Sequence, residues 1–221
     1  MTSTPTATSQ PDLIYSNGFE SGSFSGWSSV NTDSGDLRVT SPAALKGLKG
    51  MRALIDDNRA LWVADARPDR EPAYRERFYF DPNSVTMTNG NSFVLFFGYS
   101  GSAPVLRVEL RRSAGLYQVR ASARNDGTGW TGGSWYTIGD KPHYLETYWK
   151  ASTAPGADNG VLVFWVDGVR RLRLATIDND THRIDLVRLG AVAGLDAGTR
   201  GTIFIDAFET HRKTYIGAQT K

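Results

Sequence analysis

The sequence predicts an all-β protein, a two-sheet antiparallel β-sandwich of the jelly-roll type. Short runs that alternate in polarity, or are wholly apolar, recur along most of the chain between turns rich in Gly, Asn and Asp. No segment shows the apolar period of an amphipathic helix. Several runs are apolar on both parities, as in strands covered on both faces, which suits the middle of a sandwich. A closed barrel is the alternative.

The first eleven residues, MTSTPTATSQP, form a Thr/Ser/Pro tract without apolar periodicity. Such a composition cannot bury a core and is typical of linkers and stalks in secreted proteins. We therefore expect residues 1–11 to be an interdomain linker, residues 12–217 to be one domain, and residues 218–221 to be a C-terminal tail. Because residues 1–11 are interpreted as a linker, we also expect neighbouring domains to be covalently linked to this one in a larger protein.

Strands are expected in order along that domain, about fourteen in all. Asp56-Asp57-Asn58 stands between two of the early runs and predicts a hairpin turn that joins them. The runs before the centre of the chain lie near Leu13 and at 28–30, 37–39, 51–55, 60–64, 74–80, 93–99, 105–111, 117–123 and 135–138.

The central strand pair is the clearest in the sequence. Residues 144–151 alternate in polarity, and residues 161–166 are apolar on both parities, so the second strand is expected to be covered on both faces. Asp167-Gly168 follows and predicts a type I′ hairpin turn into the run 170–177, because both central residues of that turn need positive φ. Runs at 184–192 and 202–208 close the domain.

Composition excludes several classes of function. The chain has 25 Lys and Arg against 23 Asp and Glu, so it lacks the concentrated basic charge of a nucleic-acid binder. It has no Cys, which rules out disulfides, Cys-based zinc sites and a Cys nucleophile. No apolar run approaches the roughly 20 residues of a membrane span. The N-terminal residues carry no apolar core of a secretory signal.

Three short motifs resemble a known superfamily. NGFESGSFSGW at 17–27, VLVFWVDG at 161–168 and IFIDAFE at 203–209 resemble segments of concanavalin A-like and laminin-G-like jelly rolls, including secreted carbohydrate-binding modules. The resemblance implies a jelly-roll fold, and its members include lectins, binding modules, glycoside hydrolases and lyases, so the fold does not choose the activity. By the same resemblance, Glu20 and Asp206 are expected to hold a structural Ca²⁺, which takes carboxylate and carbonyl oxygens.

A candidate carbohydrate platform follows from alternation in three strands. If these strands adjoin in one sheet, their outward side chains form a polar field in which planar groups stack on sugar rings and charged groups bond to hydroxyls or carboxylates. An ordinary solvated sheet face with cross-strand ion pairs is the alternative. Trp130, in the Gly-rich loop 125–135, is a further candidate ligand contact. The platform residues are Arg107, Glu109, Arg111, Gln118, Arg120, Tyr144, Glu146, Tyr148 and Lys150.

An enzyme class also has to be weighed. Arg107 to Arg111 (RVELR) and Tyr148 to Ala151 (YWKA) are similar to two motifs of jelly-roll alginate lyases, which implies arginines that neutralise a uronate and a tyrosine that moves the C5 proton. The third motif of those enzymes, Gln-x-His, is replaced by QVR at 118–120, and the motif order is inverted. The sequence lacks the string of paired carboxylates that a jelly-roll glycosidase requires.

The sequence therefore predicts a secreted or cell-surface, non-catalytic accessory domain that binds a polysaccharide or glycoconjugate. A polysaccharide lyase on the same fold and a structural or adhesion module with a protein partner are the alternatives.

Overall fold

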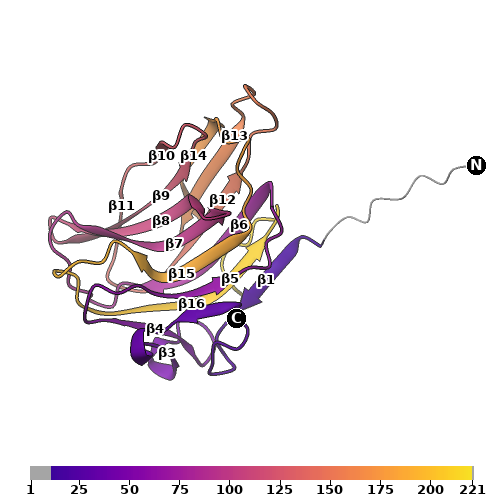
Figure 1. Cartoon of the computed structure of the whole chain (residues 1–221). Helices are drawn as coiled ribbons and strands as arrows, with labels where there is room; N and C mark the ends of the chain where they lie inside the picture. The colour runs from indigo at the N-terminus through magenta and orange to yellow at the C-terminus, as the bar shows by residue number, and fades with distance from the viewer. Residues whose placement is uncertain (1–10, 221) are drawn as a thin grey trace, which may run out of the picture.

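The computed structural model describes residues 11–220 and confirms an all-β sandwich of two antiparallel sheets (Figure 1). The helical elements in that range are two single 3-10 turns, η1 (Asp33–Gly35) and η2 (Ser41–Ala43). None of its helices has the length and apolar character needed to cross a membrane. The predicted linker falls almost wholly on residues 1–10, outside the described residues.

Sheet A has the strand order β14-β13-β12-β6-β16-β4-β3, and β1 pairs with the distal half of β16. Each neighbouring pair is antiparallel. The strands of this sheet are β1 (Leu13–Asn17), β3 (Leu37–Thr40), β4 (Gly50–Ile55), β6 (Ala73–Asp81), β12 (His143–Lys150), β13 (Gly160–Val166), β14 (Val169–Ile177) and β16 (Gly201–His211).

Sheet B has the order β10-β9-β8-β7-β15-β5-β2, and β11 also pairs with β9. Its strands are β2 (Ser29–Asn31), β5 (Leu61–Asp65), β7 (Ser92–Ser100), β8 (Ala103–Ser113), β9 (Leu116–Arg124), β10 (Trp130–Gly132), β11 (Tyr136–Ile138) and β15 (Leu186–Ala193). The predicted strands appear as observed strands, with ends shifted by a few residues, and β10 is additional to them.

Inward side chains of the two sheets form one apolar core. Phe78 of sheet A stacks on Phe96 of sheet B with ring centroids 6.3 Å apart, and Phe208 packs against Trp27 at 5.2 Å. Trp149, the largest fully buried side chain, projects from the C-terminal end of β12. The alternating pattern therefore positions one face of each strand in the core and leaves the other face for the outside of the sandwich.

The two predicted hairpins have different outcomes. Asp167 and Gly168 both have positive φ, 51° and 76°, and connect the paired strands β13 and β14, as predicted. The hairpin predicted at residues 56–58 is wrong, because β4 and β5 lie in different sheets. None of these three residues has the positive φ that a type I′ turn requires, so the segment crosses from one sheet to the other.

A bulge divides β16 between two partners. Residues 201–205 pair with β4, whereas residues 208–211 pair with β1. Between them Ala207 has φ 47°, a left-handed conformation that is strained for a residue with a Cβ. The Asp206 carboxylate stabilises it by accepting the Ala207 N–H at 2.6 Å. The bulge therefore brings the first strand of the domain against the last.

A carboxyl group is enclosed in the core. Glu76 on β6 is fully buried and accepts the Thr147 hydroxyl of the neighbouring strand at 2.5 Å. Burial raises the pKa of Glu76 to about 8, because the charged form loses its hydration, although the Thr147 hydrogen bond works in the opposite direction. The side chain is therefore mostly protonated at neutral pH.

After β16 the chain folds back over the outer face of sheet A, and we call residues 212–220 the C-terminal strap. The Glu146 carboxylate accepts the N–H groups of Ile216 and Gly217 at 3.1 and 2.9 Å. Tyr215 packs on Trp165 with ring centroids 5.4 Å apart. The strap covers the outward Trp165, and the outward Val163 is also buried, which agrees with the prediction that the run 161–166 is covered on both faces.

Candidate functional site

The outer face of sheet B presents a row of arginines across adjacent strands. Arg107 of β8 lies opposite Ser122 of β9 on one side and Phe97 of β7 on the other. Phe97 in turn lies opposite Arg188 of β15. The inward neighbours of these residues are buried in the core, as the alternation predicted. The same outer parity places Arg111 and Arg120 beside this row.

Aromatic rings lie against these arginines. The Arg107 guanidinium is 4.2 Å from the centroid of the Trp130 ring, and Arg111 and Arg120 lie 4.4 and 4.3 Å from that of Trp135. Planar guanidinium groups stack readily on indole rings, and such contacts are worth about 0.5–2 kcal/mol each. We call the surface the arginine–tryptophan face; its members are Trp62, Phe97, Tyr99, Arg107, Glu109, Arg111, Gln118, Arg120, Trp130, Trp135 and Arg188.

Glu109 is the acidic member of this face. Arg120 binds it through two nitrogens, at 2.7 and 3.2 Å, and the Arg107 Nε lies 3.1 Å from it. Burial lowers the pKa of the Arg107 guanidinium, and the Glu109 charge opposes that shift. Gln118 accepts a hydrogen bond from Arg111 at 2.7 Å. The Glu109 carboxylate thus forms ion pairs with two arginines, and the face keeps an excess of positive charge.

Arg188 has no acidic partner. Its guanidinium lies 4.2 Å from the Trp62 centroid and 5.2 Å from that of Tyr99. Among residues 11–220, no carboxylate lies within ion-pair distance of it, and its buried Nε has no hydrogen-bond partner. A charge held between two aromatic rings without a counter-ion is suited to an external anion.

Sequence reasoning found part of this face and missed the rest. Arg107, Glu109, Arg111, Gln118, Arg120 and Trp130 do come together on sheet B. The missed residues Trp62, Phe97, Tyr99 and Arg188 belong to strands β5, β7 and β15, whose place in the same sheet as β8 is not readable from local alternation. Trp135 stood in the Gly-rich loop named as a second docking place, and its stacking on two arginines of separate strands is a tertiary contact.

The expectation that β12 adjoins β8 and β9 is wrong. Tyr144, Glu146, Tyr148 and Lys150 are on β12, which pairs with β6 and β13 in sheet A. They therefore lie on the opposite outer face of the sandwich from Arg107 and Arg120. The reason is topological: the segment after β9 leaves sheet B through β11 before β12 begins.

Two of these four residues have structural partners. Glu146 is fully buried, pairs with the Arg75 guanidinium at 2.8 Å and accepts two N–H groups of the C-terminal strap. Burial raises the pKa of the Tyr144 hydroxyl to about 12, helped by the neighbouring Tyr215. The strap thus occupies the surface that Tyr144 and Glu146 were expected to offer to a ligand. Tyr148 and Lys150 lie at the end of β12, beside a hollow described below.

Glu20 and Asp206 both bind main-chain N–H groups of one loop. Asp206 accepts those of Leu45 and Lys46 at 2.9 and 2.8 Å, and Glu20 accepts that of Leu48 at 3.0 Å. Burial raises the pKa of Asp206 to about 6. The oxygens of both carboxylates thus face amide protons, so this arrangement does not fit a Ca²⁺ ion unless the loop is displaced. The metal site stays a prediction of the resemblance.

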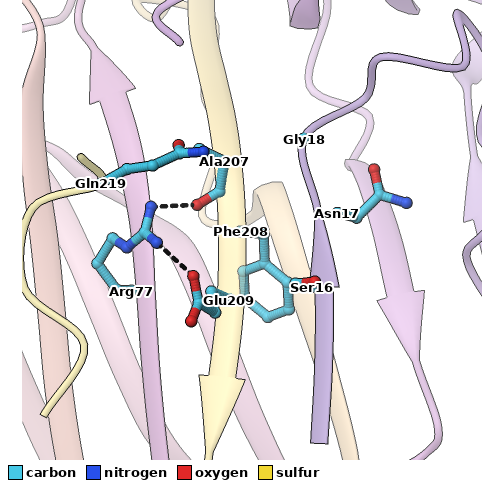
Figure 2. A pocket seen from close by; sticks show the side chains of 8 residues that line it. All are labelled: Ser16, Asn17, Gly18, Arg77, Ala207, Phe208, Glu209 and Gln219. Atoms are coloured by element: carbon cyan, nitrogen blue, oxygen red, sulfur yellow. Dashed lines mark hydrogen bonds and ion pairs between the residues drawn. The ribbon is translucent and has the colours of Figure 1, made fainter. Parts of the chain in front are cut away.

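The bulge in β16 opens a small hollow of about 170 Å³ beside β1. Figure 2 shows that Arg77 fills much of its polar lining by donating to the Ala207 carbonyl oxygen at 2.8 Å and to the Glu209 carboxylate at 2.6 Å. Arg77 is 2% exposed. Because its charge is already matched by Glu209, we interpret this hollow as a structural feature of the bulge.

A group of carboxylates lies in the loops beyond β9 and β14. Asp126, Asp178 and Asp180 can bring one oxygen each within 4.8 Å of the others. Asp126 accepts the Thr181 hydroxyl and N–H, and the hydrogen bonds from Thr181 hold its pKa below the usual range in spite of partial burial. Their mutual proximity follows from the contact between the two loops, in which the Asp126 N–H donates to the Asp178 carbonyl oxygen at 2.9 Å.

Comparison with known proteins supports the fold. No family model and no curated protein matches the chain. Among solved structures, an alginate lyase, Aly36B, has a TM-score of 0.64 at 14% identity over 92% of this chain and 98% of its own. The cellulose-induced protein Cip1 has a TM-score of 0.65 at 13% identity over 93% and 100%.

A third similar structure is the receptor-binding domain of botulinum neurotoxin type G, with a TM-score of 0.61 at 9% identity over 93% of this chain. The chain spans about half of that domain, 49%. At these identities the likeness shows a shared jelly-roll sandwich, consistent with a concanavalin A-like fold.

Proposed function

We propose that the chain binds an acidic polysaccharide on the arginine–tryptophan face, as a non-catalytic carbohydrate-binding domain of a larger extracellular protein. The observation that carries the proposal is Arg188, a half-buried cation between Trp62 and Tyr99 that has no carboxylate partner among the residues that the structure describes. Sugar rings stack on indole faces, and guanidinium groups bind carboxylates or sulfate esters through two parallel hydrogen bonds. The similar structures include carbohydrate-related proteins, which agrees with this chemistry.

Isothermal titration calorimetry with soluble alginate, and with a neutral cellulose derivative as control, tests the proposal. We expect alginate to bind and the neutral glucan to bind at least about tenfold more weakly. Replacement of both Arg188 and Trp62 by Ala is expected to abolish measurable binding. The control Arg173→Ala also removes one positive charge, on exposed β14, and is expected to leave binding unchanged. Equal binding by the double variant would overturn the proposal.

A polysaccharide lyase is the second candidate, because Arg107, Glu109 and Arg111 of the RVELR string lie on the outer face of sheet B. Tyr148, the proton-transfer residue implied by the lyase resemblance, lies on sheet A and shares no surface with Arg107. On the face itself, burial raises the pKa of Tyr99 in spite of Arg188, which makes it a poor base at neutral pH. Accumulation of unsaturated uronates on incubation with alginate would identify a lyase.

The third candidate, an adhesion module with a protein partner, would leave both titrations blank. A glycan array without signal for acidic and neutral glycans would favour it.

A further inference from the structure

A second cationic surface lies on the other side of the sandwich. A hollow of about 460 Å³ opens at the end of β12, where Tyr148 and Lys150 meet the loops that carry Ser152 and Arg183 and the start of the C-terminal strap at Lys213. We call it the cationic hollow. Its lining contains three cationic side chains and no carboxylate.

The three charges of the hollow are free of acidic partners. Within residues 11–220, no carboxylate lies within 4.0 Å of the Lys150, Arg183 or Lys213 charge. Arg183 donates only through Nη1, to the main-chain oxygens of Asp180 and His182 at 2.8 and 2.6 Å. Three like charges around one concavity create a positive potential that an anion would relieve.

The walls of the hollow are held in place by main-chain contacts. The buried Asn179 side chain accepts the Ser152 N–H at 2.7 Å. The Lys213 N–H donates to Asp12 at 2.9 Å, and its carbonyl oxygen accepts from Arg75 at 3.2 Å. The main chain around the hollow thus needs little ordering when a ligand binds, which favours affinity.

Tyr148 gives the hollow a flat aromatic wall. Its ring is 4.7 Å from the Arg75 guanidinium, which fixes the ring from behind, and Arg75 is itself neutralised by Glu146. A six-membered sugar ring matches such a wall, and its acidic substituent would then reach the neighbouring lysines.

We infer that the cationic hollow is a second binding site, specific for a single anionic sugar residue that carries a carboxylate or a sulfate ester. It lies on a different face from the arginine–tryptophan face and uses none of its residues. Because its ligand set is independent, the inference does not require the proposed function. If both sites are active, one molecule can bridge two acidic chains.

The test is a titration of the ¹⁵N-labelled chain by NMR with two probes, an alginate trisaccharide, which carries carboxylates alone, and a sulfated carrageenan disaccharide, which carries sulfate esters and no carboxylate. We expect the amide signals of Ser152, Thr153 and Arg183 to shift with at least one probe, and the responding probe identifies the anion. No shift of these signals with either probe would overturn the inference.

Variants show whether the lysines bind the anion. Replacement of Lys150 and Lys213 by Ala is expected to weaken binding at the hollow by about tenfold or more, since two charge-assisted contacts are lost. The matched control replaces half-buried Lys49 and exposed Lys141, which removes the same charge far from the hollow. Equal weakening in both variants, or none in either, would contradict the assignment.

The same spectra separate the two proposals. Shifts on β8 and β9 without shifts at the hollow support the proposed function and overturn the second site. Shifts at the hollow alone have the opposite meaning.

Discussion

At the scale of single residues, the chemistry depends on charges that are partly or wholly removed from water. Arg188 keeps its charge between two rings, and Glu76 loses its charge in the core. Two substitutions test the charged state of Arg188 and the protonated state of Glu76.

Arg188→Lys keeps the positive charge but removes the planar group that stacks on Trp62 and binds an acid through two nitrogens. We expect the affinity for soluble alginate to fall by about tenfold, with little change in thermal stability. Calorimetry measures the affinity, and Arg173→Lys on exposed β14 is the control. An unchanged affinity would show that charge alone explains binding at this position.

Glu76→Gln is expected to change how stability depends on pH. The folded pKa of about 8 exceeds the ordinary 4.5, so the folded state retains a proton that the unfolded state releases. The contribution of the Glu76 proton to the free energy of unfolding is fully present below pH 4.5 and is lost as the pH rises through 8. The loss is at most about 1.4 kcal/mol per pH unit.

The window from pH 7 to 9 separates Glu76 from Asp206, because Asp206, with a pKa raised to about 6, has largely ionised by pH 7. Urea unfolding across that window should show a declining free energy for the original chain and a flatter profile for Glu76→Gln. Parallel profiles would contradict the assignment.

At the scale of elements, the strands were predictable and their partners were not. Leu106, Val108 and Leu110 alternate with Arg107, Glu109 and Arg111 on β8, so the buried face could be derived from the sequence. The assignment of β12 to sheet A, and of β4 and β5 to different sheets, depends on contacts between residues distant along the chain. Local periodicity carries no information on those contacts.

For the same reason the site was recovered in part. Six predicted ligand residues share sheet B, because β8, β9 and β10 are successive neighbours. Arg188 comes from β15, more than sixty residues later in the chain, and only the completed sheet places it near Arg107.

Removal of the C-terminal strap tests an element that local patterns did not predict. A chain that ends at Arg212 leaves Glu146 without the N–H groups of Ile216 and Gly217 and exposes Trp165. We expect a loss of about 2–4 kcal/mol in the free energy of unfolding. Urea denaturation measures it, and a chain shortened only by Thr220 and Lys221 is the control. An unchanged midpoint would contradict this role.

At the scale of the whole molecule, the first and last strands are joined by direct contacts. Besides the β1–β16 pairing, His211 contacts the Asp12 carboxylate at 2.8 Å, and the Arg212 N–H donates to the Asp12 carbonyl oxygen at 2.8 Å. The resemblance to binding modules suggests a calcium ion as a second way to join the first and last strands.

Calcium is expected to leave the melting temperature unchanged, because Glu20 and Asp206 already accept N–H groups of the loop at 45–48. Differential scanning calorimetry with calcium and with a chelator measures the effect, and magnesium is the control. A bound ion at a hundredfold excess over its Kd would add about 2.7 kcal/mol. A rise that the chelator reverses would establish the metal site.

The β1–β16 pairing also determines how the domain would be presented when it is tethered. Both described ends of the chain lie at sheet A, where β1 pairs with β16 (Figure 1), whereas Arg107 and Arg188 belong to strands of sheet B. Immobilisation through either end therefore leaves the arginine–tryptophan face directed toward the surroundings. A neighbouring domain attached at either end would hold it in the same outward orientation.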